Sequence, residues 1–153
     1  MNIALVNLED IKELSYTLDC LEFIDIEIID AQIDLFTETN LEDVIEKNFI
    51  RNIFPLRCKN IRFSDLNLKF TAIRYYAKHY KYDIAVDTEC TLKSALITYF
   101  LSGRTAGFKE VGFLGYIKSK FYDEVLVVDT KKDKKTLTFE LLKKTFGFNV
   151  NYK

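Results

Sequence analysis

Short apolar runs alternate with amphipathic segments through much of this 153-residue chain, and this alternation constrains its fold more than any other feature. The clearest unit is the range 81–108, KYDIAVDTECTLKSALITYFLSGRTAGF. An apolar run over 82–86 leads into Asp87, a polar turn follows, and residues 91–101 resemble an amphipathic helix that ends near Gly103. Strand, turn and helix in this order indicate a parallel sheet with helical crossovers. Ligands bind at the carboxyl ends of strands in such sheets, so the turn after Asp87 is a candidate functional site.

The first fifty residues predict two strands and two helices. Residues 1–6, MNIALV, are typical of a buried central strand, and Asn7 is a candidate cap for the helix that follows. The apolar positions of that helix are Ile11, Leu14, Leu18 and Leu21. Over 23–29 isoleucines alternate with acidic residues, which predicts a strand with one polar face. Residues 40–47 are a candidate short helix.

The middle of the chain adds another strand and a longer helix. Residues 52–56 predict a strand, and Pro55 places it at a sheet edge or marks its end, because proline cannot donate a ladder hydrogen bond. Ser64 is the predicted cap of the next helix. The apolar positions of this helix are Leu66, Phe70, Ile73 and Ala77.

The last third is less regular until its final helix. Gly112 and Gly115 are expected to interrupt any regular element, and 124–129 has strand composition. Asp133 and Gly147 bracket a helix with leucines at helical spacing. These elements predict a single domain over 1–153 of the α/β class, a Rossmann-like open parallel sheet with helices on both faces.

Composition excludes several classes of function. The net charge is −1, whereas a duplex-binding domain carries a clear excess of lysine and arginine, so we expect no nucleic-acid partner. The sequence contains no run of 18 apolar residues and no signal peptide, so we expect no transmembrane segment. Cys20, Cys58 and Cys90 lack metal-site spacing and are expected to be reduced thiols. We predict no cofactor and no metal.

The central unit also resembles a known family. Asp87, Thr88, Glu89, Cys90, Thr91, Leu92, Lys93, Ser94 and Ala95, followed by Gly107 and Phe108, resemble an Asp-x-Gln-Gly-x-x-Lys-Ser element and a later Gly-Phe of the ADP-heptose:lipopolysaccharide heptosyltransferases. Thr17 and Leu18 match a His-Thr-Leu-Pro-like run in the first helix. Glu89 and Cys90 replace the family's Gln-Gly, and Lys12 and Glu13 replace its Gly-Asp.

The resemblance implies an acceptor-side domain. Family members are GT-B glycosyltransferases with two Rossmann-like domains, of which the amino-terminal domain holds the acceptor and the base and the carboxyl-terminal domain holds the ADP-sugar. This chain corresponds to the amino-terminal half. The implied base is Glu13, which would take a proton from an acceptor hydroxyl, and the implied substrate-binding residues are Asp87, Glu89, Lys93 and Ser94. The alternative is that Glu13 and Lys93 are ordinary surface residues of their helices.

Charge complicates this site. If the first and fourth strands are neighbours, Glu9, Asp10 and Glu13 lie near Asp87 and Glu89, a poor environment for a phosphorylated acceptor. The implied acceptor is a sugar or a lipid-linked sugar.

Three functions follow from the resemblance. The first is a heptosyltransferase-like domain for lipopolysaccharide or cell-envelope glycan synthesis, inactive by itself, in the cytoplasm or peripheral to the inner membrane. The second is a non-catalytic binding or assembly module that retains the fold. The third is one chain of a split or truncated enzyme. The protein partners considered are a second copy of the chain and a separate donor-binding chain.

Overall fold

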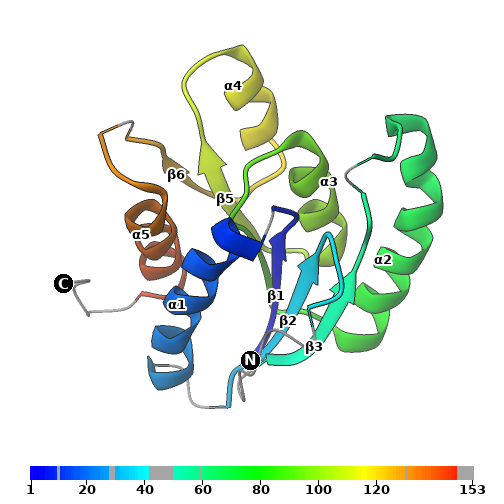
Figure 1. Ribbon diagram of the computed structural model, residues 1–153, viewed down its shortest axis with the longest axis horizontal. Helices are drawn as coiled ribbons and strands as arrows, with labels where there is room; N and C mark the ends of the chain where they lie inside the picture. The colour runs from blue at the N-terminus through cyan, green and yellow to red at the C-terminus, as the bar shows by residue number, and fades with distance from the viewer. Residues whose placement is uncertain (10, 28–29, 42–49, 59, 130, 148–153) are drawn as a thin grey trace.

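The computed structural model describes residues 1–9, 11–27, 30–41, 50–58, 60–129 and 131–147. Within these residues, strands and helices alternate along the chain (Figure 1). The strands are β1 (Asn2–Asn7), β2 (Gln32–Thr37), β3 (Ile50–Pro55), β4 (Ile84–Asp87), β5 (Thr105–Lys109) and β6 (Glu124–Val127). The helices are α1 (Ile11–Glu27), α2 (Leu66–Tyr80), α3 (Leu92–Leu101), α4 (Phe113–Ser119) and α5 (Lys134–Phe146).

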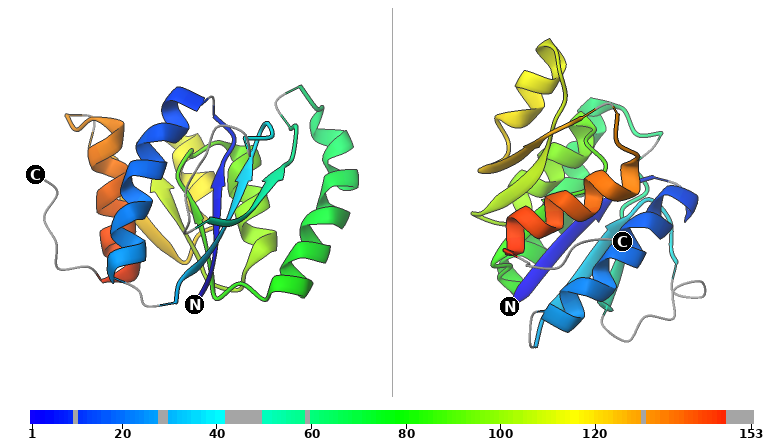
Figure 2. Two further views of the ribbon diagram at one scale, coloured as in Figure 1. Left: turned by 60° about the horizontal axis from the view of Figure 1, so that its bottom comes forward. Right: turned by 90° about the vertical axis from the view of Figure 1, so that its left-hand side faces the viewer.

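The described strands form one six-stranded sheet in the order β3-β2-β1-β4-β5-β6, and every neighbouring pair is parallel. Helices α1 and α5 pack together on one face, and α2 and α3 pack together on the other (Figure 2). Ile3, Ala4, Leu5 and Val6 of β1 have no exposed surface, as expected for a central parallel strand covered on both faces. The predicted α/β fold is confirmed.

Several predicted elements are confirmed. The range 81–108 forms β4, α3 and β5, and β3 is an edge strand that ends at Pro55. Asp133 caps α5 by accepting a hydrogen bond from the Thr136 backbone N–H, and Gly147 ends that helix with a left-handed φ of 73°.

The strand predicted over 23–29 is wrong, because α1 continues through Glu27. The second strand of the sheet is β2, which the sequence analysis did not predict. Its residues 33–37 are all buried beside β1, but Asp34 and Thr37 are polar, so the segment shows neither a continuous apolar run nor strict alternation. The predicted helix over 40–47 lies almost entirely outside the described residues.

Three predictions about helix ends and breaks are also wrong. Asn7 ends β1 and does not cap α1, because its side chain is used within the turn described below. The N-cap of α2 is Asp65, and Ser64 lies in a preceding 3-10 turn. Gly115 does not interrupt regular structure but lies inside α4, where a Cβ would come within 2.1 Å of the Glu110 carbonyl oxygen. That close approach lets the chain turn sharply from β5 into α4.

Candidate functional site

The carboxyl ends of β1 and β4 meet at one edge of the sheet. These strands are direct neighbours with Val6 opposite Asp87, as the sequence analysis expected. The turns that follow them are joined by buried polar side chains. The Asn7 amide donates to the hydroxyl oxygens of Thr17 at 3.2 Å and Thr88 at 3.0 Å, which ties β1, α1 and the β4–α3 turn together.

Asp87 organises the β4–α3 turn from inside the protein. It is fully buried, and its Oδ1 accepts hydrogen bonds from the backbone N–H groups of Glu89 at 2.9 Å and Cys90 at 3.0 Å. Its Oδ2 accepts from the hydroxyls of Ser94 at 2.7 Å and Tyr122 at 2.5 Å. Burial raises the pKa of this carboxyl, and the hydrogen bonds partly counter that effect.

Glu89 is the carboxylate that this turn presents at the edge. Its Oε2 accepts a hydrogen bond from the Leu8 backbone N–H at 2.7 Å, which connects the two turns. Burial, followed by the negative charge of Asp87, raises the pKa of Glu89 to about 7. A carboxyl group with that pKa is present in both protonation states near neutral pH and can therefore exchange a proton with a bound hydroxyl.

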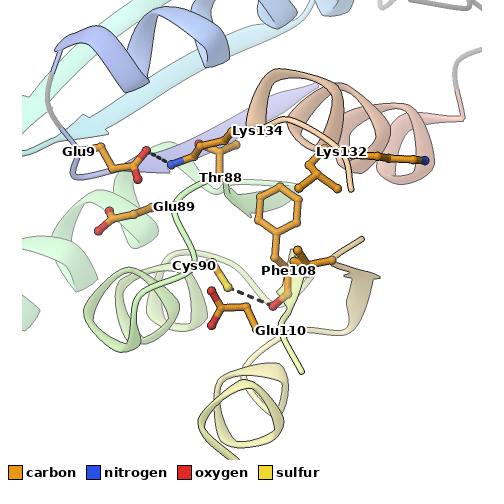
Figure 3. A pocket seen from close by; sticks show the side chains of 10 residues that line it. Glu9, Thr88, Glu89, Cys90, Phe108, Glu110, Lys132 and Lys134 are labelled. Carbon is orange, nitrogen blue, oxygen red and sulfur yellow. Dashed lines mark hydrogen bonds and ion pairs between the residues drawn. The ribbon is translucent and has the colours of Figure 1, made fainter. Parts of the chain in front are cut away.

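Glu89 lines a pocket of about 370 Å³ (Figure 3). The loops after β1, β4, β5 and β6 contribute to it, so it sits where parallel α/β sheets bind ligands. Its lining residues are Glu9, Thr88, Glu89, Cys90, Phe108, Glu110, Val128, Lys132, Lys134 and Leu137. The Phe108 ring gives the pocket an apolar wall, and three carboxylates give it hydrogen-bond acceptors.

The lysines around this pocket form ion pairs with carboxylates. Lys134 pairs with Glu9, as Figure 3 shows, and Lys132 pairs with Glu140. Lys118 is only 9% exposed. Its ammonium donates to the Glu110 carboxylate and, at 2.6 Å, to the Cys90 carbonyl. Glu9 and Glu110 are paired in the same way, so among the described residues Glu89 is the pocket carboxylate that forms no ion pair.

The predicted site residues thus separate into different environments. Glu89 lies in the pocket, whereas Asp87 and Ser94 are buried behind it. Ser94 also forms a capping box with Thr91 at the start of α3. Lys93 turns toward the β3–α2 loop, where its Nζ donates to the Cys58 carbonyl at 2.9 Å and the Ile61 carbonyl at 3.0 Å. Whether these residues contact a substrate stays a prediction.

Glu13 lies in the first turn of α1, but its side chain falls outside the described part of the structure. Its predicted role as base therefore also stays a prediction. Sequence reasoning missed Glu110, Lys118 and Lys134 as residues of this edge. They follow β5 and β6, far along the chain from the matched motif, and nothing in their local sequence sets them apart from surface charges.

Two further properties concern the described residues. No group of three or more His, Cys, Asp or Glu side chains there is arranged to hold a metal ion. None of the helices in this part of the chain has the length and apolar character needed to cross a membrane.

The solved structures that resemble this chain include heptosyltransferases. E. coli heptosyltransferase WaaC with ADP has a TM-score of 0.80 and 19% identity, over 97% of this chain and 48% of that one. The glycosyl transferase family 9 protein from Veillonella parvula has a TM-score of 0.72 and 12% identity, over 97% of this chain and 42% of that one. E. coli ADP-heptose lps heptosyltransferase II has a TM-score of 0.72 and 14% identity, over 92% of this chain and 40% of that one.

These comparisons show the fold: the chain has the Rossmann-like architecture found in one part of the heptosyltransferase structures. It spans about half the length, or less, of the structures that it matches. No protein-family model and no curated protein matches its sequence.

Proposed function

We propose that this chain is a heptosyltransferase-like acceptor-side domain that acts in lipopolysaccharide or cell-envelope glycan synthesis. In this proposal residues 1–153 form one domain equivalent to the amino-terminal half of such an enzyme. The domain works in the cytoplasm or at the inner membrane, with the donor sugar held by a separate domain or chain. The observation that carries the proposal is Glu89, a carboxyl group with a pKa of about 7 in a pocket at the carboxyl edge of the sheet.

The proposed chemistry is proton removal from an acceptor hydroxyl. As that oxygen attacks the anomeric carbon of the donor sugar, a carboxylate takes its proton, and the bond from the anomeric carbon to the ADP oxygen breaks with its electron pair leaving on ADP. Glu13 and Glu89 are the two candidate bases, because the turns after β1 and β4 are neighbours. Glu89 is poised for either proton transfer or a hydrogen bond to the hydroxyl.

The pocket's charge indicates which part of the acceptor it holds. Glu9, Glu89 and Glu110 line the pocket together with Lys132 and Lys134, and both lysines are paired with carboxylates. Carboxylates accept hydrogen bonds from sugar hydroxyls, and the Phe108 ring can pack against a sugar's apolar face. We assign this pocket to the neutral, hydroxyl-bearing part of an acceptor, with any anionic group outside it.

The test is ligand titration followed by amide NMR. Neutral methyl glycosides should shift the resonances of residues 88–90, and Glu89→Gln should weaken this binding by roughly tenfold, about the value of one charge-assisted hydrogen bond. Glu124→Gln is the matched control, because Glu124 pairs with Arg104 near the start of β6, away from the pocket. If none of the glycosides shifts the turn, or Glu89→Gln binds them as well as the native chain, the assignment fails.

A second candidate function is a non-catalytic binding or assembly module. It is favoured by the internal use of three motif residues: Asp87 and Ser94 hold the turn, and Lys93 binds loop carbonyls. This candidate predicts no heptose transfer in the presence of any donor-binding chain. Transfer from ADP-heptose that appears only when a separate donor-binding chain is added would instead identify one chain of a split enzyme.

A further inference from the structure

Helix α4 and the turn before it carry a group of apolar side chains that the described residues leave exposed. Val111 is 87% exposed, Phe113 77%, Leu114 68% and Tyr116 51%. We refer to these four residues as the apolar tip. Figures 1 and 2 show that α4 stands out from the body of the domain, beyond the carboxyl end of β5. Contiguous exposed apolar side chains of this kind mark interaction surfaces.

The apolar tip is held in a defined shape. Gly112 has a left-handed φ of 110°, and Gly115 lies so close to the Glu110 carbonyl that no side chain fits there. Lys118 reaches back from α4 to Glu110 and to the Cys90 carbonyl. These contacts anchor the tip to the β4–α3 turn, and Glu110 lines the candidate pocket one residue before the tip begins. The tip and the pocket therefore share one edge of the domain.

The residues around the tip are mainly basic. Lys109 precedes it and Lys120 follows it, with the Lys120 ammonium 4.6 Å from the centre of the Tyr116 ring. Glu110, the one acidic residue between them, pairs with Lys118. The next loop along the chain is joined to this edge by the Val128 N–H, which donates to the Lys109 carbonyl, and it carries the exposed Asp129 and Lys131.

We propose that the apolar tip inserts into the surface of an anionic lipid bilayer. Phe, Tyr and Leu are the side chains that enter the headgroup boundary, and lysines beside them gain attraction from anionic lipids. The inference rests on the proposed function in one respect: insertion at this edge places the pocket next to the bilayer, where the sugar of a lipid-linked acceptor would be.

A second copy of the chain fits this surface less well. Three side chains on a helix of seven residues, with Val111 just before it, fall short of the roughly 800 Å² per partner that a stable interface buries. A two-fold contact through the tip would also bring the lysines of one copy toward those of the other, and like charges repel.

The test uses the absence of tryptophan from the chain. Phe113→Trp creates a single fluorescent reporter in the tip, and Tyr99→Trp places the control reporter at another exposed aromatic position, on α3. With vesicles containing phosphatidylglycerol, the emission of the tip reporter should shift to the blue and be quenched by brominated acyl chains, whereas the emission of the control reporter should not change. Vesicles of phosphatidylcholine alone should bind less, and added salt should weaken binding to the anionic ones.

A second variant distinguishes insertion of the apolar tip from nonspecific adsorption to the vesicles. Phe113→Ser with Leu114→Ser should reduce sedimentation with anionic vesicles by about tenfold or more, since apolar burial supplies much of the binding. Circular dichroism should show an unchanged fold, because both side chains are exposed. Unchanged emission from the tip reporter, sedimentation that survives the double substitution, or a dimer that depends on the tip would each overturn the proposal. The glycoside titration contains no lipid, so its failure and the failure of this proposal are distinguishable.

Discussion

The Tyr122 hydroxyl donates a 2.5 Å hydrogen bond to the buried Asp87 carboxylate. This bond joins residues 35 positions apart and connects the segment between α4 and β6 to the β4–α3 turn. Asp87 in turn accepts hydrogen bonds from the backbone of Glu89 and Cys90. The position of the Glu89 carboxylate therefore depends on an aromatic residue far along the chain, and not on the turn alone.

Tyr122→Phe removes one donor to Asp87 and leaves the ring in place. We expect the free energy of unfolding to fall by about 1–3 kcal/mol, because a buried carboxyl loses a hydrogen-bond partner. Urea denaturation measures this change. Tyr116→Phe is the matched control and should be near neutral, since Tyr116 is half exposed. Equal stability of the two variants would contradict the importance of the Tyr122–Asp87 bond.

Gly107→Ala should destabilise the protein because the Tyr122 ring lies directly over Gly107. An added Cβ would be 2.4 Å from the ring, which cannot move freely while it holds Asp87. We expect a loss of about 2–3 kcal/mol. In a Tyr122→Ala background the same substitution should cost much less, and a double-mutant cycle measures that coupling. Gly103→Ala is the control, since nothing lies within 4 Å of its added Cβ.

Glu89→Gln should change how stability depends on pH. The pKa of Glu89 is raised from its ordinary 4.5 to about 7 in the folded protein, so folding favours the protonated form. Its favourable contribution is complete below pH 4.5 and is lost as pH rises through 7. The variant should therefore gain stability relative to the native chain between about pH 4.5 and 7, by about 1–3 kcal/mol. Denaturation at several pH values measures this gain, and a constant difference would contradict the raised pKa.

Arg51→Met should lower the stability of the protein by removing an ion pair with Asp34 at the opposite end of the sheet. Asp34 has no exposed surface and accepts hydrogen bonds from Arg51 at 2.6 and 2.9 Å and from the Tyr82 hydroxyl at 2.7 Å. Removing the guanidinium leaves a buried carboxylate without its counter-charge, which costs about 3 kcal/mol. Arg104→Met, which breaks a partly exposed pair with Glu124, should cost about 1 kcal/mol or less. Thermal or urea unfolding compares the two, and similar losses would contradict this account.

The sequence by itself determined the parts of the protein that rest on local signals. The run into Asp87, the amphipathic segment from Thr91 and the stop near Gly103 predict β4 and α3, because an apolar run, a helical spacing and a break each act within a few residues. Asp133 and Gly147 bracket α5 for the same reason. The alternation of such units also predicts a parallel sheet, and it puts Glu89 at the carboxyl edge, where the structure has its pocket.

Only the tertiary structure decided where helices end, which segments become strands and which side chains lie in contact. Residues 23–27 alternate like a strand but extend α1, while β2 gains its place through pairing with β1 and β3. The pocket combines Glu89 with Glu110 and Lys134, and the turn that holds Glu89 depends on Tyr122. These contacts join residues distant in sequence, and their energies come from burial and neighbouring charge, which no local pattern of residues contains.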